Sequence, residues 1–182
     1  MLLDHIKTIP DHRRGQGKLF DLPHVLLFSI LAIASGADSY RKMAIYIQEN
    51  FETLKKHYDL SWKRPPNYNS IRHIIHSMDF DEVEKAFRAY SQEVRKKTKK
   101  YTVISIDGKA LKGSFDTVED ERFKQILSAF SPTDNLIIAH AKIGVSKDNE
   151  INAARKMMEQ IKIPHTLYTL DALHTQKKRL KP

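Results

Sequence analysis

The strongest constraint on the fold is a change of hydrophobic period partway along the chain. Before residue 95, apolar residues recur every three or four positions, which is typical of amphipathic helices. After a basic segment at residues 95–100, short β-branched runs alternate with turn residues, which is typical of strands. The sequence therefore predicts an α+β protein, with an all-helical domain over residues 1–96 and a β-rich domain over residues 97–182.

The first domain is expected to contain four helices, with apolar residues at helical spacing over residues 25–34, 43–57, 71–78 and 83–94. The second helix is expected to be continuous, because this spacing is kept from Met43 to about His57. Residues that favour the N-cap position precede each helix. The expected caps are Asp21, Asp38 or Ser39, Asn69 or Ser70, and Asp79 or Asp81.

The second domain is expected to contain three strands, a helix and a fourth strand. The strands are predicted over residues 101–106, 124–130, 136–145 and 166–170, with a hairpin loop at residues 131–135. Asn149 is expected to cap the helix, over residues 150–161. This order is the opening of a ribonuclease-H-like fold, in which the first and fourth strands lie side by side and parallel.

Two aspartates follow the first and fourth predicted strands, namely Asp107 and Asp171. In a ribonuclease-H-like arrangement their carboxylates converge, and oxygen ligands of this kind suit Mg²⁺. Two such ions can activate an attacking oxygen and stabilise a leaving one in phosphodiester chemistry. On spacing alone, the simpler interpretation is that Asp107-Gly108 forms a turn and Asp171 caps a helix.

Composition narrows the class of partner. The chain has 31 basic and 22 acidic residues, a net charge of +9, which favours polyanionic partners such as nucleic acid. It has no cysteine, which excludes disulfides and thiolate zinc sites and fits a cytoplasmic setting. The longest apolar run, at residues 25–34, is shorter than the about 20 residues that a membrane span needs, so no membrane partner is expected.

The sequence motifs around the two aspartates resemble those of a known family. Asp107 lies in the segment IDGKALKGS (residues 106–114) and Asp171 in LDALHTQ (residues 170–176). Both resemble DDE transposases of the H-repeat-associated insertion-sequence group, whose motifs D-G-K-x-x-[RK]-G-S and D-A-L-x-x-Q hold the first and second catalytic aspartates. Further segments resemble the family in the same order: residues 9–17, 36–39, 69–72, 127–130 and 147–151.

The resemblance implies a helical N-terminal domain associated with DDE catalytic domains, followed by the start of a ribonuclease-H-like catalytic domain. It implies strand cleavage and transfer at transposon ends, dependent on Mg²⁺ or Mn²⁺. Asp107 and Asp171 would be the catalytic residues and metal ligands. DNA phosphate contacts would come from Arg13, Arg14, Arg72, Lys109 and Lys112. Partners would be DNA and either a second copy of the chain or a full-length transposase.

The sequence departs from the family pattern at the third acid, a glutamate on a helix well beyond the second aspartate. Residues 172–182 contain no Asp or Glu, and Glu150 precedes Asp171 and suits a capping role. We therefore expect a C-terminally truncated and inactive copy whose second domain is poorly stable. Two alternatives remain open: a non-catalytic DNA-binding protein that inhibits a full-length transposase, and a remnant without a role.

Three other candidates have simpler interpretations. Residues 108–114 are not a Walker phosphate loop, because no lysine follows Gly113. His73 and His76 could ligate a metal, but surface or capping roles suit them better without cysteine partners. Trp62 could stack on a base, but anchoring its loop is the favoured role.

Overall fold

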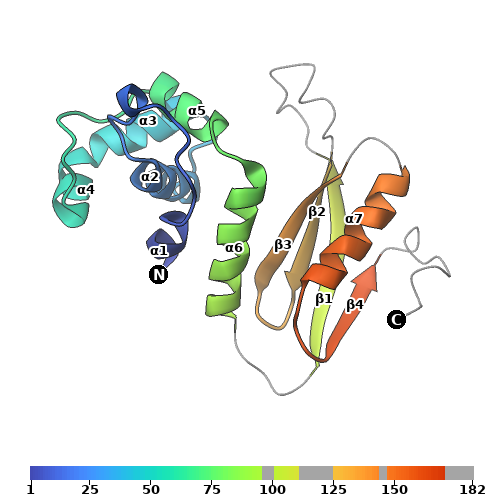
Figure 1. The fold of residues 1–182 in the computed structure, drawn as a ribbon. Coiled ribbons are helices and arrows are strands. Elements are labelled where there is room, and N and C mark those ends of the chain that lie inside the picture. Colours follow the sequence, from blue (N-terminus) through green and yellow to red (C-terminus); the bar gives the residue numbers. More distant parts are fainter. Residues whose placement is uncertain (96–100, 111–124, 144–146, 171–182) are drawn as a thin grey trace. The chain divides into compact units, whose positions relative to one another are not determined.

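The computed structural model describes residues 1–95, 101–110, 125–143 and 147–170. The chain divides into two compact units, Met1–Phe87 and Arg88–Pro182, and helix α6 contributes residues to both (Figure 1). The first unit is helical, and the second holds the sheet. The predicted α+β class is therefore confirmed.

The first unit is built around helix α2 (Leu22–Ala34), whose Leu22, Val25 and Phe28 are at most 1% exposed. A helix that is apolar on most of its circumference is expected to be buried on most sides. Around it are α1 (Leu2–Ile6), a 3-10 turn (Gly15–Gly17), α3 (Tyr40–Glu49), α4 (Phe51–Tyr58), α5 (Tyr68–His76) and the first part of α6 (Phe80–Val94).

Three of the expected caps are confirmed by hydrogen bonds. At α6 the cap is Asp79, not Asp81, and its carboxylate accepts from the backbone N–H groups of Asp81 and Glu82 at 2.8 and 3.3 Å. The Asp21 carboxylate accepts from the backbone N–H of His24 at 3.3 Å, and Ser39, not Asp38, accepts from that of Lys42 at 3.4 Å. These bonds satisfy N–H groups that have no partner inside the helix.

Two other expectations for this unit are wrong. The helix α5 is capped by Asn67, which accepts from the Ser70 N–H at 2.8 Å, so neither Asn69 nor Ser70 is the cap. The predicted continuous helix is two helices, α3 and α4, separated by Asn50 (φ −102°, ψ 9°). The Asn50 side-chain amide donates to the Tyr46 carbonyl at 2.8 Å, a local bond of the kind that competes with regular helix.

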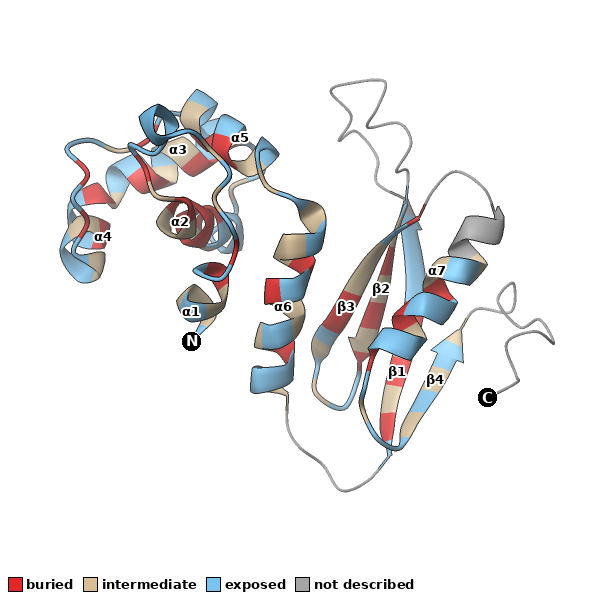
Figure 2. Ribbon diagram, in the orientation of Figure 1, coloured by how far each residue is buried: buried red, intermediate tan, exposed pale blue. Residues whose placement is uncertain are grey.

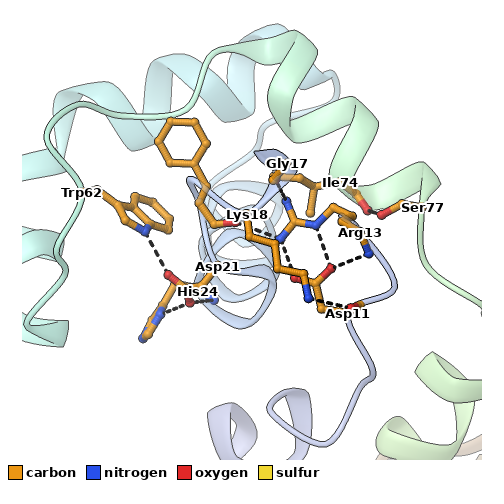
Figure 3. Close-up of polar contacts among 10 residues, drawn as sticks. Asp11, Arg13, Gly17, Lys18, Asp21, His24, Trp62, Ile74 and Ser77 are labelled. Atoms are coloured by element: carbon orange, nitrogen blue, oxygen red, sulfur yellow. Dashed lines mark hydrogen bonds and ion pairs between the residues drawn. The ribbon is translucent and has the colours of Figure 1, made fainter. Parts of the chain in front are cut away.

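The Asp21 carboxylate also fixes the loop after α4. One oxygen accepts from Trp62 Nε1 at 2.9 Å, and the other contacts both the backbone N–H and ring Nδ1 of His24 (Figure 3). Trp62 is 3% exposed and packs edge-on against Phe20 and Phe28. Trp62 therefore anchors its loop, as expected, and its ring is not available to stack on a base.

A second polar cluster holds the segment that leads into α2. The Arg13 guanidinium donates to both Asp11 carboxylate oxygens, at 2.9 and 2.8 Å, and to the carbonyls of Gly17 and Phe20, each at 2.9 Å (Figure 3). Lys18 Nζ adds a bond to the Asp11 carbonyl. The hydrogen bond from Arg13 lowers the pKa of the Asp11 carboxyl below its ordinary value. We call this cluster the Arg13 clamp.

One segment of the described chain, Gly15–Ala34, is apolar and long enough to cross a membrane by length and composition alone. The helix within it, α2, has only 13 residues, which corresponds to about 20 Å against a bilayer core of about 30 Å. Its most apolar residues lie in the core of the first unit. Packing within the protein accounts for its composition.

The second unit is a mixed sheet with one helix packed against it and with the end of α6, where Ser91 and Arg88 donate, each at 3.0 Å, to the backbone carbonyls of Ile137 and His140, respectively. Its elements are β1 (Thr102–Ala110), β2 (Gln125–Ser131), β3 (Leu136–Ile143), α7 (Lys147–Gln160) and β4 (Thr166–Leu170). The strand order is β3-β2-β1-β4; β2 is antiparallel to both neighbours and β4 is parallel to β1. The expectation that the first and fourth strands are parallel neighbours is confirmed.

Two boundaries in this unit differ from the prediction. The first strand does not end before Asp107 but runs to Ala110, because β2 pairs with it as far as Ala110 opposite Gln125. The alternative of an Asp107-Gly108 turn is therefore wrong. Helix α7 begins at Lys147 rather than after Asn149, since no helix breaker separates these residues.

The two faces of the sheet differ in burial. One face packs against α7, and its core includes Ile104, Leu127, Ile143, Ala154 and Met157, each at most 2% exposed (Figure 2). Met157 is more deeply buried than its neighbour Met158. The strand residues of the opposite face are half-buried or exposed. We call this opposite side the open face.

We predict that Asp21→Ala lowers the free energy of unfolding of the first unit by about 2–3 kcal/mol, because it removes a helix cap and leaves the buried Trp62 N–H unpaired. Trp62 is the only tryptophan of the chain, so its fluorescence during urea denaturation reports this unit alone. Asp38→Ala is the matched control, since Asp38 is 70% exposed, and should leave the midpoint unchanged. Equal effects of the two substitutions would contradict the proposed role of Asp21.

We predict that Arg13→Met destabilises the first unit by about 1–2 kcal/mol at pH 7. Folding lowers the pKa of the Asp11 carboxyl. The contribution of the Asp11–Arg13 pair to the free energy of unfolding is therefore complete above the unfolded pKa of about 3.9, and it is lost as the pH falls through the lower folded pKa. The difference between wild type and variant should shrink between pH 5 and about pH 3. Urea denaturation at several pH values measures it, with the exposed Arg14→Met as control; a constant difference would show that Arg13 acts without Asp11.

Candidate functional site

Asp107 lies within β1, on the open face of the sheet, with an exposed side chain. The parallel register between β1 and β4 runs from Thr102 opposite Thr166 to Ile106 opposite Leu170. In both strands the next residue in the sequence is an aspartate, Asp107 in one and Asp171 in the other. Asp171 itself lies outside the described residues.

A row of polar residues crosses the open face at the level of Asp107. Asp107 is directly opposite Ser128 on β2, and Ser128 is directly opposite His140 on β3. Directly paired residues of neighbouring strands place their side chains on the same face. We call Asp107, Ser128 and His140 the polar row.

A second row lies two residues further along the strands. Lys109 is opposite Ile126, and Ile126 is opposite Lys142, so two lysines flank one isoleucine. Both lysines are exposed and Ile126 is half-buried. We call these three residues the lysine row. The rows together carry one acidic and two basic side chains on adjacent levels of one face.

The sequence prediction missed Ser128, His140 and Lys142. The signal that could have found them is the hairpin loop between β2 and β3, which fixes which residues face one another. A β-bulge between Ala129 and Phe130 shifts that register, however, and such a bulge is not visible in the sequence. Counting back from the loop alone would have paired the wrong residues.

The other predicted DNA-binding residues are divided between the units. Arg13, Arg14 and Arg72 belong to the first unit, and Lys109 to the second, whereas Lys112 lies outside the described residues. Arg14 is exposed and Arg72 is half-buried. The Arg13 side chain is only 10% exposed, and its donors are used within the clamp. Lys109 lies on the same strand as Asp107, two residues further along.

Carboxylate oxygens are suitable ligands for a hard divalent cation, and Asp107 offers one exposed carboxylate. Within the described residues no group of three or more His, Cys, Asp or Glu side chains could hold a metal ion. His73 and His76 therefore lack the further ligands that a zinc site would need in this part of the chain. A metal ion at Asp107 would need further ligands from outside the described residues.

The positive charge is concentrated in the second unit. Met1–Phe87 contains 12 Lys and Arg against 11 Asp and Glu, a net +1, whereas Arg88–Pro182 contains 19 against 11, a net +8. Nearly all of the excess therefore belongs to the unit that carries Asp107. Attraction of a polyanion should act mainly on this unit.

Comparison with known proteins identifies relatives for almost the whole chain. Residues 3–91 match the family model described as DDE_Tnp_1-associated. The chain is 32% identical over 177 residues to the Escherichia coli K12 protein named "Putative transposase YncI", covering 97% of this chain and 70% of that protein. It is 28% identical to the "H repeat-associated putative transposase YhhI" of the same strain, covering 97% of this chain and 46% of that protein.

The relatives differ in length. The YncI protein of Escherichia coli O157:H7 is also 32% identical, but the chain spans only 44% of it. No solved structure matches the chain significantly. The match to the associated-domain model and the identity across most of the K12 protein agree with the family resemblance of the sequence. The chain belongs to the H-repeat-associated family of DDE-type transposases, with their DDE_Tnp_1-associated N-terminal domain.

Proposed function

We propose that this chain binds DNA at transposon ends and contributes Asp107 and Asp171 to the metal-dependent active site of a DDE transposase. The observation that best supports the proposal is the parallel register of β1 and β4, in which Ile106 is opposite Leu170 and an aspartate follows each. Carboxylates that follow equivalent positions of adjacent parallel strands can share a cation. This is also the opening topology of a ribonuclease-H-like domain.

The two aspartates would hold Mg²⁺ or Mn²⁺, which in phosphodiester chemistry activates the attacking oxygen and stabilises the leaving one. The chain's own residues bind and orient the DNA. The Asp107 carboxylate is exposed, so a phosphate can approach it, and Lys109 lies on the same face two residues away. The Lys109 ammonium can attract the DNA phosphate backbone there without displacing a metal ion from the Asp107 carboxylate.

DDE chemistry uses a third carboxylate, and residues 172–182 contain neither Asp nor Glu. A polypeptide of these 182 residues thus supplies two of the three acids. We propose that by itself it binds DNA but does not complete strand transfer, because metal sites lose affinity and activity when ligands or their supports are removed. The excess of +8 in the second unit supports DNA binding, which is also the basis of a second candidate, a non-catalytic DNA-binding protein that inhibits a full-length transposase.

We predict that the 182-residue chain binds a 30-base-pair duplex with an affinity that falls steeply with salt. If about four or five phosphates are contacted, the slope of log K against log salt is about −4. Fluorescence anisotropy between about 50 and 200 mM salt measures it. Without divalent metal, Asp107→Asn should bind more tightly than wild type, because it removes a negative charge from the DNA-facing side.

The same assay separates the two candidate functions. Mn²⁺-dependent nicking that disappears in Asp107→Asn would show residual catalysis, whereas binding without nicking supports the non-catalytic role. Glu159→Gln is the control, because Glu159 is an exposed carboxylate on α7, on the other side of the sheet. An absence of salt-dependent DNA binding would contradict the proposed function in both forms.

A further inference from the structure

In the first unit, α2, a short turn and α3 follow one another as in a helix-turn-helix motif. Helix α2 ends in a Schellman motif, in which the Gly36 and Ala37 N–H groups donate to carbonyls of the last helical turn, each at 2.9 Å. Gly36 has a φ of 94°, which glycine adopts without steric cost. The chain then leads directly to Ser39, which caps α3. In DNA-binding proteins with this motif, the second helix lies in the major groove.

Helix α3 is buried on one side and exposed on the other. Met43 and Ile47 lie in the core of the unit. The opposite side carries residues at spacings of three and four, namely Arg41, Ala44, Ile45 and Gln48. Three of these are exposed, and Ile45 is 58% exposed although it is apolar. The exposed side is about 10 Å long from first to last residue, which corresponds to about three base pairs of DNA.

The exposed side of α3 forms one wall of a groove of about 310 Å³. The other wall is the segment PPNY (residues 65–68), which leads into α5. The Arg41 guanidinium lies over the Tyr68 ring, 5.3 Å from its centre. Such a contact uses the face of the guanidinium and leaves its N–H edge to other partners. All eight residues of the groove belong to the first unit, in which every residue is described.

The chemistry of the groove suits the base edges of DNA. Arginine pairs with guanine and glutamine with adenine through two hydrogen bonds each, and apolar side chains contact the thymine methyl group. Arg41, Gln48 and Ile45 supply these three kinds of contact on one helix. No carboxylate is among the eight residues, so no negative charge in the lining opposes a phosphate backbone. A helix about 10–12 Å across also fits a major groove about 12 Å wide.

We propose that α3 lies in the major groove of DNA and recognises base edges through Arg41, Ile45 and Gln48, with Tyr68 holding the Arg41 guanidinium in place. The inference deepens the proposed function and rests on it. Base recognition by hydrogen bonds does not need a large net charge, so it is compatible with the net +1 of this unit. The second unit, with +8, supplies the attraction to phosphate. Tyr68 is a positioning residue, and the three residues of α3 are binding residues.

The test begins with the 182-residue chain selecting a preferred sequence from a library of random-sequence duplexes. Fluorescence anisotropy then compares the selected duplex with its single-base variants, for the unsubstituted chain, Arg41→Ala and Gln48→Ala. Lys56→Ala is the matched control, because Lys56 is an exposed cation of α4 that does not line the groove. Circular dichroism checks that each variant folds.

We expect Arg41→Ala and Gln48→Ala each to lose discrimination at one base pair, by roughly 5- to 150-fold. Lys56→Ala should keep discrimination at every position. Tyr68→Ala should weaken discrimination at the same base pair as Arg41→Ala, whereas Tyr68→Phe, which keeps the ring, should not. Because the chain has no cysteine, Gln48→Cys should form a disulfide with a thiol tethered to the major-groove edge of a base several-fold faster than Lys56→Cys.

Three results would overturn the inference and leave the proposed function standing, provided that salt-dependent DNA binding is intact. The first is unchanged discrimination in both Arg41→Ala and Gln48→Ala, and the second is the absence of any preferred sequence for the unsubstituted chain. The third is an Ile45→Glu variant that dissociates a dimer without changing the preferred sequence, since the groove would then contact a second copy. Absence of DNA binding by the unsubstituted chain would overturn both the inference and the proposed function.

Discussion

The parallel pairing of β1 with β4 is the constraint on which the site depends. Strands that follow one another in a hairpin cannot be parallel, so this pairing needs a crossover, which α7 supplies. The helix covers one face with Ala154 and Met157, and the polar residues at the level of Asp107 lie on the other face. The same pairing sets Ile106 opposite Leu170, and in the sequence an aspartate follows each of these two residues.

The two units differ in the roles of their polar residues and in their net charge. In the helical unit, Asp21 and Arg13 form hydrogen bonds within the protein. Asp21 caps α2 and accepts from Trp62, and Arg13 binds Asp11 and the Phe20 carbonyl in the segment before α2. That unit is nearly neutral, with a net charge of +1. The sheet unit carries the remaining charge and Asp107. Of the arginine pair near the N-terminus, Arg13 has its donors within the clamp, whereas Arg14 is exposed.

Local signals predicted part of this arrangement from the sequence. The Asp21 cap and the fourth strand at residues 166–170 are encoded within a few neighbouring residues, and both are confirmed. The break at Asn50 was not predictable from apolar spacing, because it depends on a side-chain bond to Tyr46. The length of β1 beyond Asp107 depends on its partner β2, and the alignment of Ser128 with His140 depends on a bulge. Pairing between strands that are distant in the sequence decides strand length and register, and a short stretch of sequence does not show which strands pair.

The most direct test of a shared metal site at Asp107 and Asp171 is Mn²⁺ binding by the 182-residue chain, followed through the electron paramagnetic resonance signal of free Mn²⁺. The variants are Asp107→Asn, Asp171→Asn and the double substitution, with Glu159→Gln as control. If one ion is held by both carboxylates, each single substitution weakens binding strongly and the double substitution adds little, because coupled residues are not additive. Unchanged affinity in Asp171→Asn, or independent additive losses, would contradict the shared site.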